Sequence, residues 1–163
     1  MKTIKNAMSK VNLTYTKGIS VSASPSVFAF GAQGGVSIDT KGNVAIQGTF
    51  STGLTGGSPG AAVTSFNTIT NAPNIDSLNG MSYQIGASGG TVIEGVPIVA
   101  IADFNLIPGQ TNNDLYYGGT VGAGFGTPGI EGHVTMSNTV TWDETKFNVF
   151  DVAEKIDKTI EEW

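Results

Sequence analysis

The sequence has no cysteine and no arginine, and it has few charged residues of any kind. Without cysteine, neither disulfides nor thiolate zinc sites can form. Without arginine, the chain has none of the bidentate clamps that proteins use for phosphate and carboxylate groups. Charged residues make up 13% of the chain, about half the usual share, while its 23 glycines are about twice the usual share. This composition predicts one β-rich domain with many turns and close backbone contacts.

Positive charge is missing from the middle of the chain. All eight basic residues are lysines, and none lies between Gly42 and Thr145. Nucleic-acid binding requires clustered basic side chains that displace counterions. We therefore expect neither nucleic acid nor nucleotide as a partner, and no cofactor. The same interval carries these acidic residues: Asp76, Glu94, Asp103, Asp114, Glu131, Asp143 and Glu144.

Long apolar runs are also missing. No run approaches the roughly 20 residues of a membrane helix. Residues 1–17 lack the apolar segment of a secretory signal peptide. If the protein is exported, we expect the address to lie outside this sequence and the chain to be part of a longer protein.

The chain does contain a sustained alternation of polar and apolar residues over residues 11–142. The clearest case is residues 35–50, where Val36 and Ile38 precede a turn and Val44 follows it. One face is apolar and the other polar, which is typical of an antiparallel sheet with one covered side. Lys17 and Gly18 interrupt the alternation and are expected to end one strand, and a hairpin turn is expected around Glu94 and Gly95. About nine or ten such strands predict a mainly β fold, an antiparallel meander closed into a barrel, or a sandwich.

Three further segments complete the predicted domain, which is a single unit over residues 1–163. Residues 2–10 could form a short basic helix. Residues 71–80 have turn composition with two apolar anchors, and we expect a lid or plug over one end of the sheet. Residues 147–163 predict an amphipathic helix that packs on the sheet, caps an open end or binds a partner. Its apolar positions are Val149, Val152, Ala153, Ile156, Ile160 and Trp163.

An imperfect repeat connects two distant parts of the chain. Residues 57–70 and 126–141 both begin with Gly, Ser or Thr, Pro and Gly, and both end in Asn-Thr, Ile or Val, and Thr. The repeat predicts two matching units of a turn and a long strand. Asn67 and Asn138 are equivalent in it, although asparagine is disfavoured within strands. We expect either matched ligand contacts or β-bulges at these two positions, with bulges favoured.

A hydrolase motif is present as a string but not in its usual context. Gly56–Gly60 matches the Gly-x-Ser-x-Gly nucleophile elbow, and Asp103 or Asp114 and then His133 follow in the order of α/β-hydrolases. That motif requires a helix after the serine, whereas a strand is predicted here. The repeat also places Thr127 where Ser58 stands. A turn explains both copies, and a catalytic triad does not.

Two residues remain as candidates for catalysis. His133 is the only histidine, and Glu131 lies two residues before it on the same predicted strand face. A neighbouring carboxylate can tune an imidazole for acid–base chemistry. The alternative is an exposed or hydrogen-bonded strand histidine with no catalytic role. No dense acidic loop supplies further ligands, so we predict no metal site.

Aromatic side chains provide the candidate ligand contacts. Tyr116 and Tyr117, with Asn67 and Asn138, could line a face that binds sugar or lipid. Aromatic residues in strands are more often part of a core, and that alternative stays open.

Three segments resemble the variable C-terminal domains of bacterial RHS-repeat and related polymorphic-toxin-type proteins. They are Ile38–Gln47, Thr70–Gly80 and Gly126–Gly129, and the resemblance covers roughly residues 18–142. It implies a domain delivered at the tip of a larger exported protein, secreted or at the cell surface, with a toxin-type role. An immunity protein would then be a partner. The resemblance implies no catalytic residue.

Three functions follow from these observations. The first is a non-enzymatic effector domain acting at a membrane or cell envelope, consistent with low charge, alternating strands and a terminal amphipathic helix. Against it, the sequence shows no Tyr/Trp belts, and the strands look short for the ~9–11 residues that a span requires. The second is a soluble barrel that binds a small apolar ligand or a sugar. The third is a hydrolase that uses His133 with a carboxylate.

Overall fold

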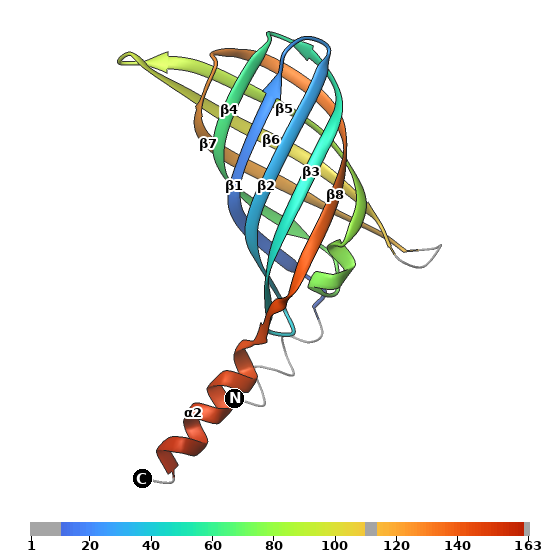
Figure 1. Ribbon diagram of the computed structural model, residues 1–163, viewed down its shortest axis with the longest axis vertical. Helices are drawn as coiled ribbons and strands as arrows, with labels where there is room; N and C mark the ends of the chain where they lie inside the picture. The colour runs from blue at the N-terminus through green and yellow to red at the C-terminus, as the bar shows by residue number, and fades with distance from the viewer. Residues whose placement is uncertain (1–10, 110–113, 162–163) are drawn as a thin grey trace.

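The computed structural model describes residues 11–109 and 114–161, so the helix predicted at residues 2–10 lies outside it. Eight antiparallel strands close into one barrel, and a helix follows the last strand (Figure 1). The predicted fold class, mainly β with a barrel and a C-terminal helix, is confirmed. The elements are β1 (Thr14–Ser24), β2 (Phe28–Asp39), β3 (Asn43–Gly57), β4 (Gly60–Thr70), η1 (Ile75–Leu78), β5 (Gly80–Ile93), β6 (Val96–Pro108), β7 (Leu115–Gly126), β8 (Gly129–Asn148) and α2 (Val149–Glu161).

The strands number eight rather than nine or ten because Lys17 and Gly18, which were expected to end a strand, lie inside one. β1 continues through Lys17 and Gly18, where the sequence predicted a break. Gly18 lies opposite Gly35 on β2, and a Cβ atom at Gly18 would clash with the carbonyl oxygen of Gly34. Glycine permits this close backbone approach, so the strand curves without ending.

The strand order forms two Greek keys rather than the expected meander. Around the barrel the order is β4-β1-β2-β3-β8-β5-β6-β7, closing back on β4. Each half of the chain, β1–β4 and β5–β8, has the order 4-1-2-3 of a Greek key. The halves join where β3 pairs with β8 and β4 pairs with β7. The repeated Gly-(Ser/Thr)-Pro-Gly turn connects β3 to β4 and β7 to β8, so the repeat marks equivalent strands on opposite sides of the barrel.

The faces of the strands are inverted relative to the expected covered apolar side. On β2, Ser37 and Asp39 are buried, at 0% and 3% exposure, whereas Val36 and Ile38 are 50% and 38% exposed. Among the described residues, the buried set contains sixteen polar or charged side chains and eight apolar ones. The interior of the barrel is therefore polar, and its outer surface is apolar.

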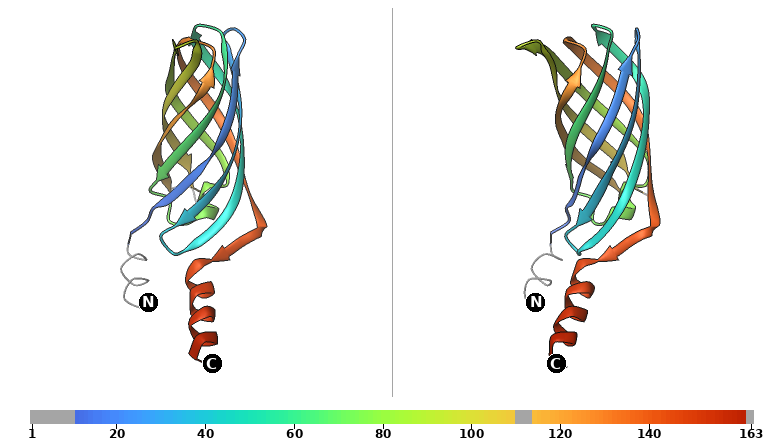
Figure 2. Two further views of the ribbon diagram at one scale, coloured as in Figure 1. Left: turned by 90° about the vertical axis from the view of Figure 1, so that its left-hand side faces the viewer. Right: turned by 60° about the vertical axis from the view of Figure 1, so that its left-hand side comes forward.

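The two ends of the barrel differ (Figure 2). The turn end consists of four short turns, at residues 25–27, 58–59, 94–95 and 127–128. The plug end carries the start of β1, the end of β8 and the segment between β4 and β5. That segment closes the end as predicted: Ala72 and Leu78 are buried with Ile107 from β6.

Asp39 fastens the plug to the wall. Its carboxylate is 3% exposed and accepts hydrogen bonds from the backbone N–H groups of Lys41 at 2.9 Å, Asn43 at 3.0 Å and Ile75 at 3.4 Å. The hydroxyl of Thr14 donates to the carbonyl of Ala72 at 3.0 Å. These contacts satisfy the buried carboxylate and hold the β2–β3 turn against η1.

Helix α2 extends away from the plug end and neither packs on the sheet nor caps the barrel (Figure 1). Val152 and Ile156 on this helix are 46% and 55% exposed. The helix begins directly after β8, so no loop lets it fold back. Its attachment is local: the N–H of Val149 donates to the carbonyl of Gly42 at 2.9 Å, and Phe150 lies against Gly42. Within residues 11–109 and 114–161, no helix is long and apolar enough to cross a membrane.

Candidate functional site

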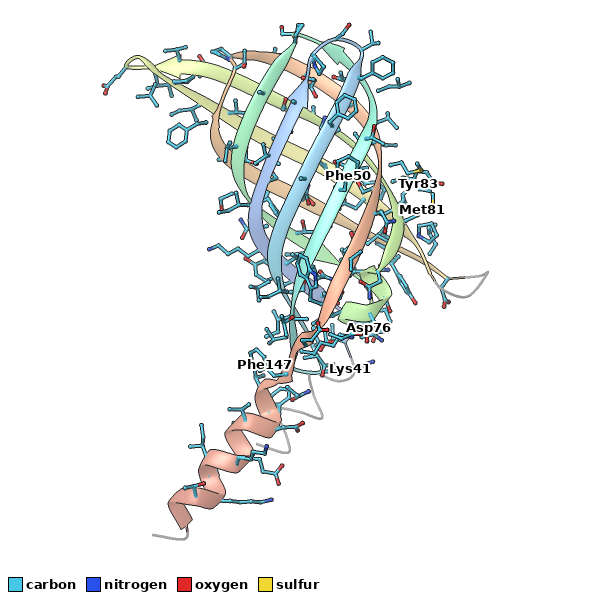
Figure 3. The ribbon with its side chains drawn as sticks, viewed as in Figure 1. Lys41, Phe50, Asp76, Met81, Tyr83 and Phe147 are labelled. Carbon is cyan, nitrogen blue, oxygen red and sulfur yellow. The ribbon has the colours of Figure 1, made fainter. Side chains whose placement is uncertain are left out.

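The outer surface of the barrel wall, defined as strand residues from Thr14 to Trp142, is strongly apolar. Exposures are 77% for Ile130, 65% for Phe125 and 62% for Leu54. Figure 3 shows Phe50, Met81 and Tyr83 pointing outward, while Lys41 and Asp76 lie at the plug end. Among the described residues of the wall, Lys17 is the one outward-facing charged side chain, three residues from the start of β1.

Tyrosine and tryptophan gather at one end of this surface. Tyr15, Tyr83 and Tyr117 lie within the first four residues of strands that begin at the plug end. Trp142 pairs with Ile46, the fourth residue of β3, which also begins there. All four face outward and are exposed. The structure thus has one aromatic belt, where the sequence suggested none, because register brings together residues far apart in the chain.

The inner surface is held by hydrogen bonds between side chains. The amide of Gln84 donates from Nε2 to Oδ1 of Asn105 at 2.9 Å, and its Oε1 accepts from the hydroxyl of Ser137 at 3.0 Å. Asn105 donates in turn to Thr120 at 2.8 Å, and Thr120 contacts the hydroxyl of Thr68 at 2.6 Å. This network crosses from β8 through β5, β6 and β7 to β4, and it satisfies polar groups that would be costly to bury alone.

A cluster of ionisable residues, here called the mouth cluster, lies inside the barrel near the turn end. It consists of Asp103, His133 and Glu131, with Ser24 as its neutral member. Nε2 of His133 is 3.1 Å from Oδ1 of Asp103, and Nδ1 is 3.6 Å from Oε1 of Glu131. The hydroxyl of Ser24 on β1 donates to Oε2 of Glu131. The cluster therefore reaches across the lumen from β6 and β8 to β1.

Gly86 makes the contact between aspartate and imidazole possible. It lies on β5 between the two strands and is the register partner of both Asp103 and His133. With no side chain at this position, the two groups meet above the glycine backbone. A Cβ atom there would clash with Oδ1 of Asp103.

The mouth cluster is screened from bulk water, with side-chain exposures of 6% for Asp103, 15% for His133 and 17% for Glu131. Oδ1 of Asp103 is the one buried side-chain oxygen or nitrogen without a hydrogen bond among the described residues. The nearby carboxylate of Asp103 nevertheless raises the pKa of His133 above its ordinary value, against the effect of burial. The two carboxylates and one imidazole carry a formal charge of −1 or −2, depending on the imidazole. No group of three or more histidine, aspartate or glutamate side chains within the described ranges could hold a metal ion.

Two cavities occupy the lumen. The one at the turn end has about 860 Å³ of empty space, including its open mouth, and the mouth cluster lines it. The other has about 570 Å³ and extends to Leu78 of the plug. Gln33 and Gln84 line both. An eight-stranded barrel is only wide enough for side chains or one small ligand, so this lumen is not a broad aqueous channel.

The plug end carries ion pairs. Nζ of Lys146 lies 2.6 Å from Oδ1 of Asp143 and also contacts the carboxylate of Asp76 on the plug. Hydrogen bonds to Asp143 and then Asp76 hold the pKa of Lys146 above its ordinary value. These residues lie beyond the wall. The ion pair of Lys146 with Asp76 connects the plug to β8, in addition to the contacts of Asp39 and Thr14 with the plug.

The structure does not gather the predicted ligand residues into one site. Asn67 and Asn138 both face outward, on strands at opposite sides of the barrel. Strand register is continuous at both, so the bulge prediction is wrong; the irregularity in the β3–β8 pairing falls between Val44 and Ile46. Asn67 instead accepts a hydrogen bond from the Tyr15 hydroxyl.

The two candidate tyrosines point to opposite sides of β7. Tyr117 faces outward in the aromatic belt, whereas Tyr116 faces inward and packs on the plug residues Ala72 and Leu78. Their adjacency in sequence places them on opposite faces because side chains alternate along a strand.

The catalytic candidates His133 and Glu131 do come together, and the structure adds Asp103 to them. Sequence reasoning named Asp103 among the acidic residues of the middle of the chain and as a possible aspartate of the hydrolase string, but no sequence signal placed it beside His133. Ser58 lies in the β3–β4 turn and is followed by a strand, so the hydrolase elbow is not formed.

The fold and its surfaces define an eight-stranded antiparallel barrel with a polar lumen, an apolar wall and one plugged end. Among solved structures, it is similar to the virulence-associated protein VapB from the intracellular pathogen Rhodococcus equi. The similarity has a TM-score of 0.37 and 16% sequence identity, and it covers 80% of this chain and 99% of VapB. No protein-family model and no curated protein sequence matches the chain.

Proposed function

We propose that this chain is a non-enzymatic, exported effector-type β-barrel that acts by inserting its wall into a lipid bilayer. The observation that carries the proposal is the inverted polarity of the wall. A soluble barrel places apolar side chains inward, whereas a membrane barrel has an apolar outer band and a polar interior. Here the largest exposed apolar residues face outward on every strand, and the buried residues are mostly polar.

The backbone also meets the requirement of a membrane span. Every strand pairs with two neighbours around the closed barrel, so open sheet edges are confined to strand ends such as the tip of the β5–β6 hairpin. β1 to β7 are 11 to 15 residues long, which exceeds the ~9–11 residues that a tilted transmembrane strand needs. The sequence predicted strands shorter than a span requires, but the strands are longer because they continue through glycines such as Gly18.

The geometry of the mouth cluster gives little support to a catalytic role. The imidazole of His133 has carboxylates at both ring nitrogens, and the one hydroxyl in the mouth cluster, Ser24, contacts Glu131 and not His133. A nucleophile activated by histidine would need to be within hydrogen-bond reach of it. The toxin-type role, secretion and an immunity-protein partner belong to this proposal as expectations from the resemblance to polymorphic-toxin domains.

Vesicle flotation tests the proposal. Purified protein is mixed with phosphatidylcholine vesicles, and with vesicles that also contain phosphatidylglycerol. It should float with both and show a blue-shifted Trp142 emission in a Trp163→Phe background. Dye release is not required, because the lumen is narrow and plugged. A monomer that stays in the aqueous fraction would contradict insertion. A stable oligomer that stays in the aqueous fraction would also contradict insertion, and it would show that a second copy of the chain covers the wall.

The turn-end cavity supports a second candidate, a soluble barrel that binds a small hydroxylated ligand such as a sugar. Its lining includes the hydroxyls of Ser20, Ser51 and Thr64 and the amide of Gln33, which suit a polar ligand better than an apolar one. Saturation-transfer NMR with a panel of monosaccharides tests it. Transfer that is lost in Gln33→Met would support the site, and no transfer to any sugar would exclude this class.

A further inference from the structure

We propose that the barrel enters the bilayer with its turn end first, led by the tip of the β5–β6 hairpin, and that Glu94 opposes this step. The inference rests on the proposed membrane function and adds a direction and a barrier to it.

The tip of this hairpin stands free of the barrel. Pairing of β5 with β8 ends at Gly90, and pairing of β6 with β7 begins at Ile98. Between these points, Thr91 to Ile93 pair only with β6, and Val96 and Pro97 pair only with β5, so the hairpin projects past the rim (Figure 1). It projects sideways from the rim at the turn end, away from the other strands, so its side chains are accessible to a surface that this end approaches (Figure 2).

The free tip is apolar. Every residue from Thr91 to Ile98 is exposed, unlike the alternating burial in the rest of β5 and β6. Val92 and Ile93 are 53% and 54% exposed, and Val96 is 43% exposed. The tip has no neighbouring strand to cover these side chains, so they are available to lipid on both faces of the hairpin.

The distribution of charge sets the direction of insertion. The four turns of the turn end contain one charged residue, Glu94. The plug end and the chain just beyond it carry Lys41, Asp76, Asp143, Glu144 and Lys146, followed by a helix with charged residues of both signs. The mouth cluster is enclosed in the lumen, whereas these plug-end charges lie outside the wall. Moving exposed charges through hydrocarbon is costly, so the turn end crosses at lower cost than the plug end. The Tyr/Trp belt near the plug end fits the headgroup region where insertion would stop.

Glu94 occupies a position that its own turn does not favour. Its φ is 51° and that of Gly95 is 81°, so both central residues of the two-residue turn are left-handed. Asparagine, aspartate and glycine are the residues preferred in such a turn. Glu94 has no hydrogen bond or ion pair with any described residue. The tip of the hairpin therefore carries a carboxylate, although neutral asparagine would be more favourable in this turn.

The experiment uses single-cysteine probes, which the cysteine-free chain makes unambiguous. The environment-sensitive fluorophore NBD is attached at Val96→Cys on the tip, or at Thr159→Cys on α2 as the plug-end probe. Each is combined with wild-type Glu94, Glu94→Asp or Glu94→Asn, and stopped-flow emission is recorded after mixing with phosphatidylcholine vesicles. Aspartate and asparagine suit the turn equally and differ only in charge.

The tip probe should move into lipid, with a blue shift and protection from an aqueous quencher, while the helix probe stays accessible. With asparagine at position 94, the insertion rate should be about tenfold higher than with aspartate. The free-energy cost of burying a charged side chain in the bilayer corresponds to more than a tenfold change in rate. Glu144→Gln changes the net charge by the same amount at the other end and should leave the rate within about twofold.

Three results would overturn the inference. Flotation with a buried helix probe and an exposed tip probe would keep the membrane function and reverse the direction. A buried tip probe with equal rates for aspartate and asparagine would remove the role of Glu94. A protein that does not float at all would remove the proposed function and this inference with it.

Discussion

The two faces of the barrel wall are stabilised in different ways. The inner face holds side-chain hydrogen bonds such as Gln84 to Asn105, whereas the outer face presents side chains such as Phe125 and Val121 with little cover. The fold in water therefore depends on satisfied polar contacts in the lumen more than on apolar burial. The apolar area that stabilises an ordinary domain from within lies here on the outer face. Substitutions on the two faces should consequently affect different measurements.

The largest effect is expected from a charge placed midway along the outer face. Val121 is the seventh residue of β7 and is 59% exposed, so Val121→Lys should leave the fold in water intact. In lipid, a lysine at the bilayer midplane costs about 2–4 kcal/mol. Vesicle flotation should fall by at least about tenfold, with an unchanged circular dichroism spectrum.

Leu115→Lys is the matched control, since Leu115 is the first residue of the same strand, at the plug end. A lysine near the interface costs only about 0–1 kcal/mol, so flotation should change little. Equal losses in the two variants would show that the wall is not embedded to the expected depth.

On the inner face, Gln84→Met should destabilise the fold in water. Methionine keeps the length of the side chain but leaves Asn105 and Ser137 without their partner. Loss of buried hydrogen bonds of this kind costs about 1–3 kcal/mol. Urea unfolding measures the change in free energy. Gln33→Met is the control, because Gln33 faces the same lumen without a hydrogen bond to any described side chain, and its change should stay within about 0.5 kcal/mol.

A smaller effect is expected at Gly86. Gly86→Ala inserts a methyl group against Oδ1 of Asp103 and should push that carboxylate away from His133. Overpacking of this kind costs about 1–2 kcal/mol, and the imidazole carbon shifts of His133 should change at fixed pH. Gly89→Ala on the same strand has open space around its Cβ position and should alter neither quantity. Unchanged His133 shifts in Gly86→Ala would mean that the glycine does not set the contact.

The barrel, the terminal helix, the Glu94–Gly95 hairpin and the plug follow from sequence pattern, but the orientation of the wall does not. The alternation of Val36, Ser37 and Ile38 shows that adjacent side chains point to opposite faces of the sheet. It does not show whether the apolar face or the polar face lies inside the barrel. The predicted strand count was too high because Gly18, considered alone, indicates the end of a strand. In the structure, glycine is needed at this position because the backbone of β2 lies too close for a Cβ atom.

The candidate site was only partly predictable for a related reason. His133 and Glu131 are close in sequence, so their shared face could be read directly. Asp103 meets His133 across Gly86, and this depends on which strands become neighbours. Greek-key order places β5 between β6 and β8, and nothing local in the sequence specifies it.

The two Greek keys also bear on how the barrel closes. Of the two seams that join the halves, β3–β8 pairs the most distant parts of the chain, as in Asn43 with Asn148. Pairing of such distant residues carries the largest loop-closure cost, so we expect this seam to close last. Before it closes, the eight strands form one curved sheet with β3 and β8 as free edges and an apolar convex side. Because open strand edges are costly in hydrocarbon, the proposed insertion would be coupled to closure of this seam, and folding and insertion would be one kinetic process.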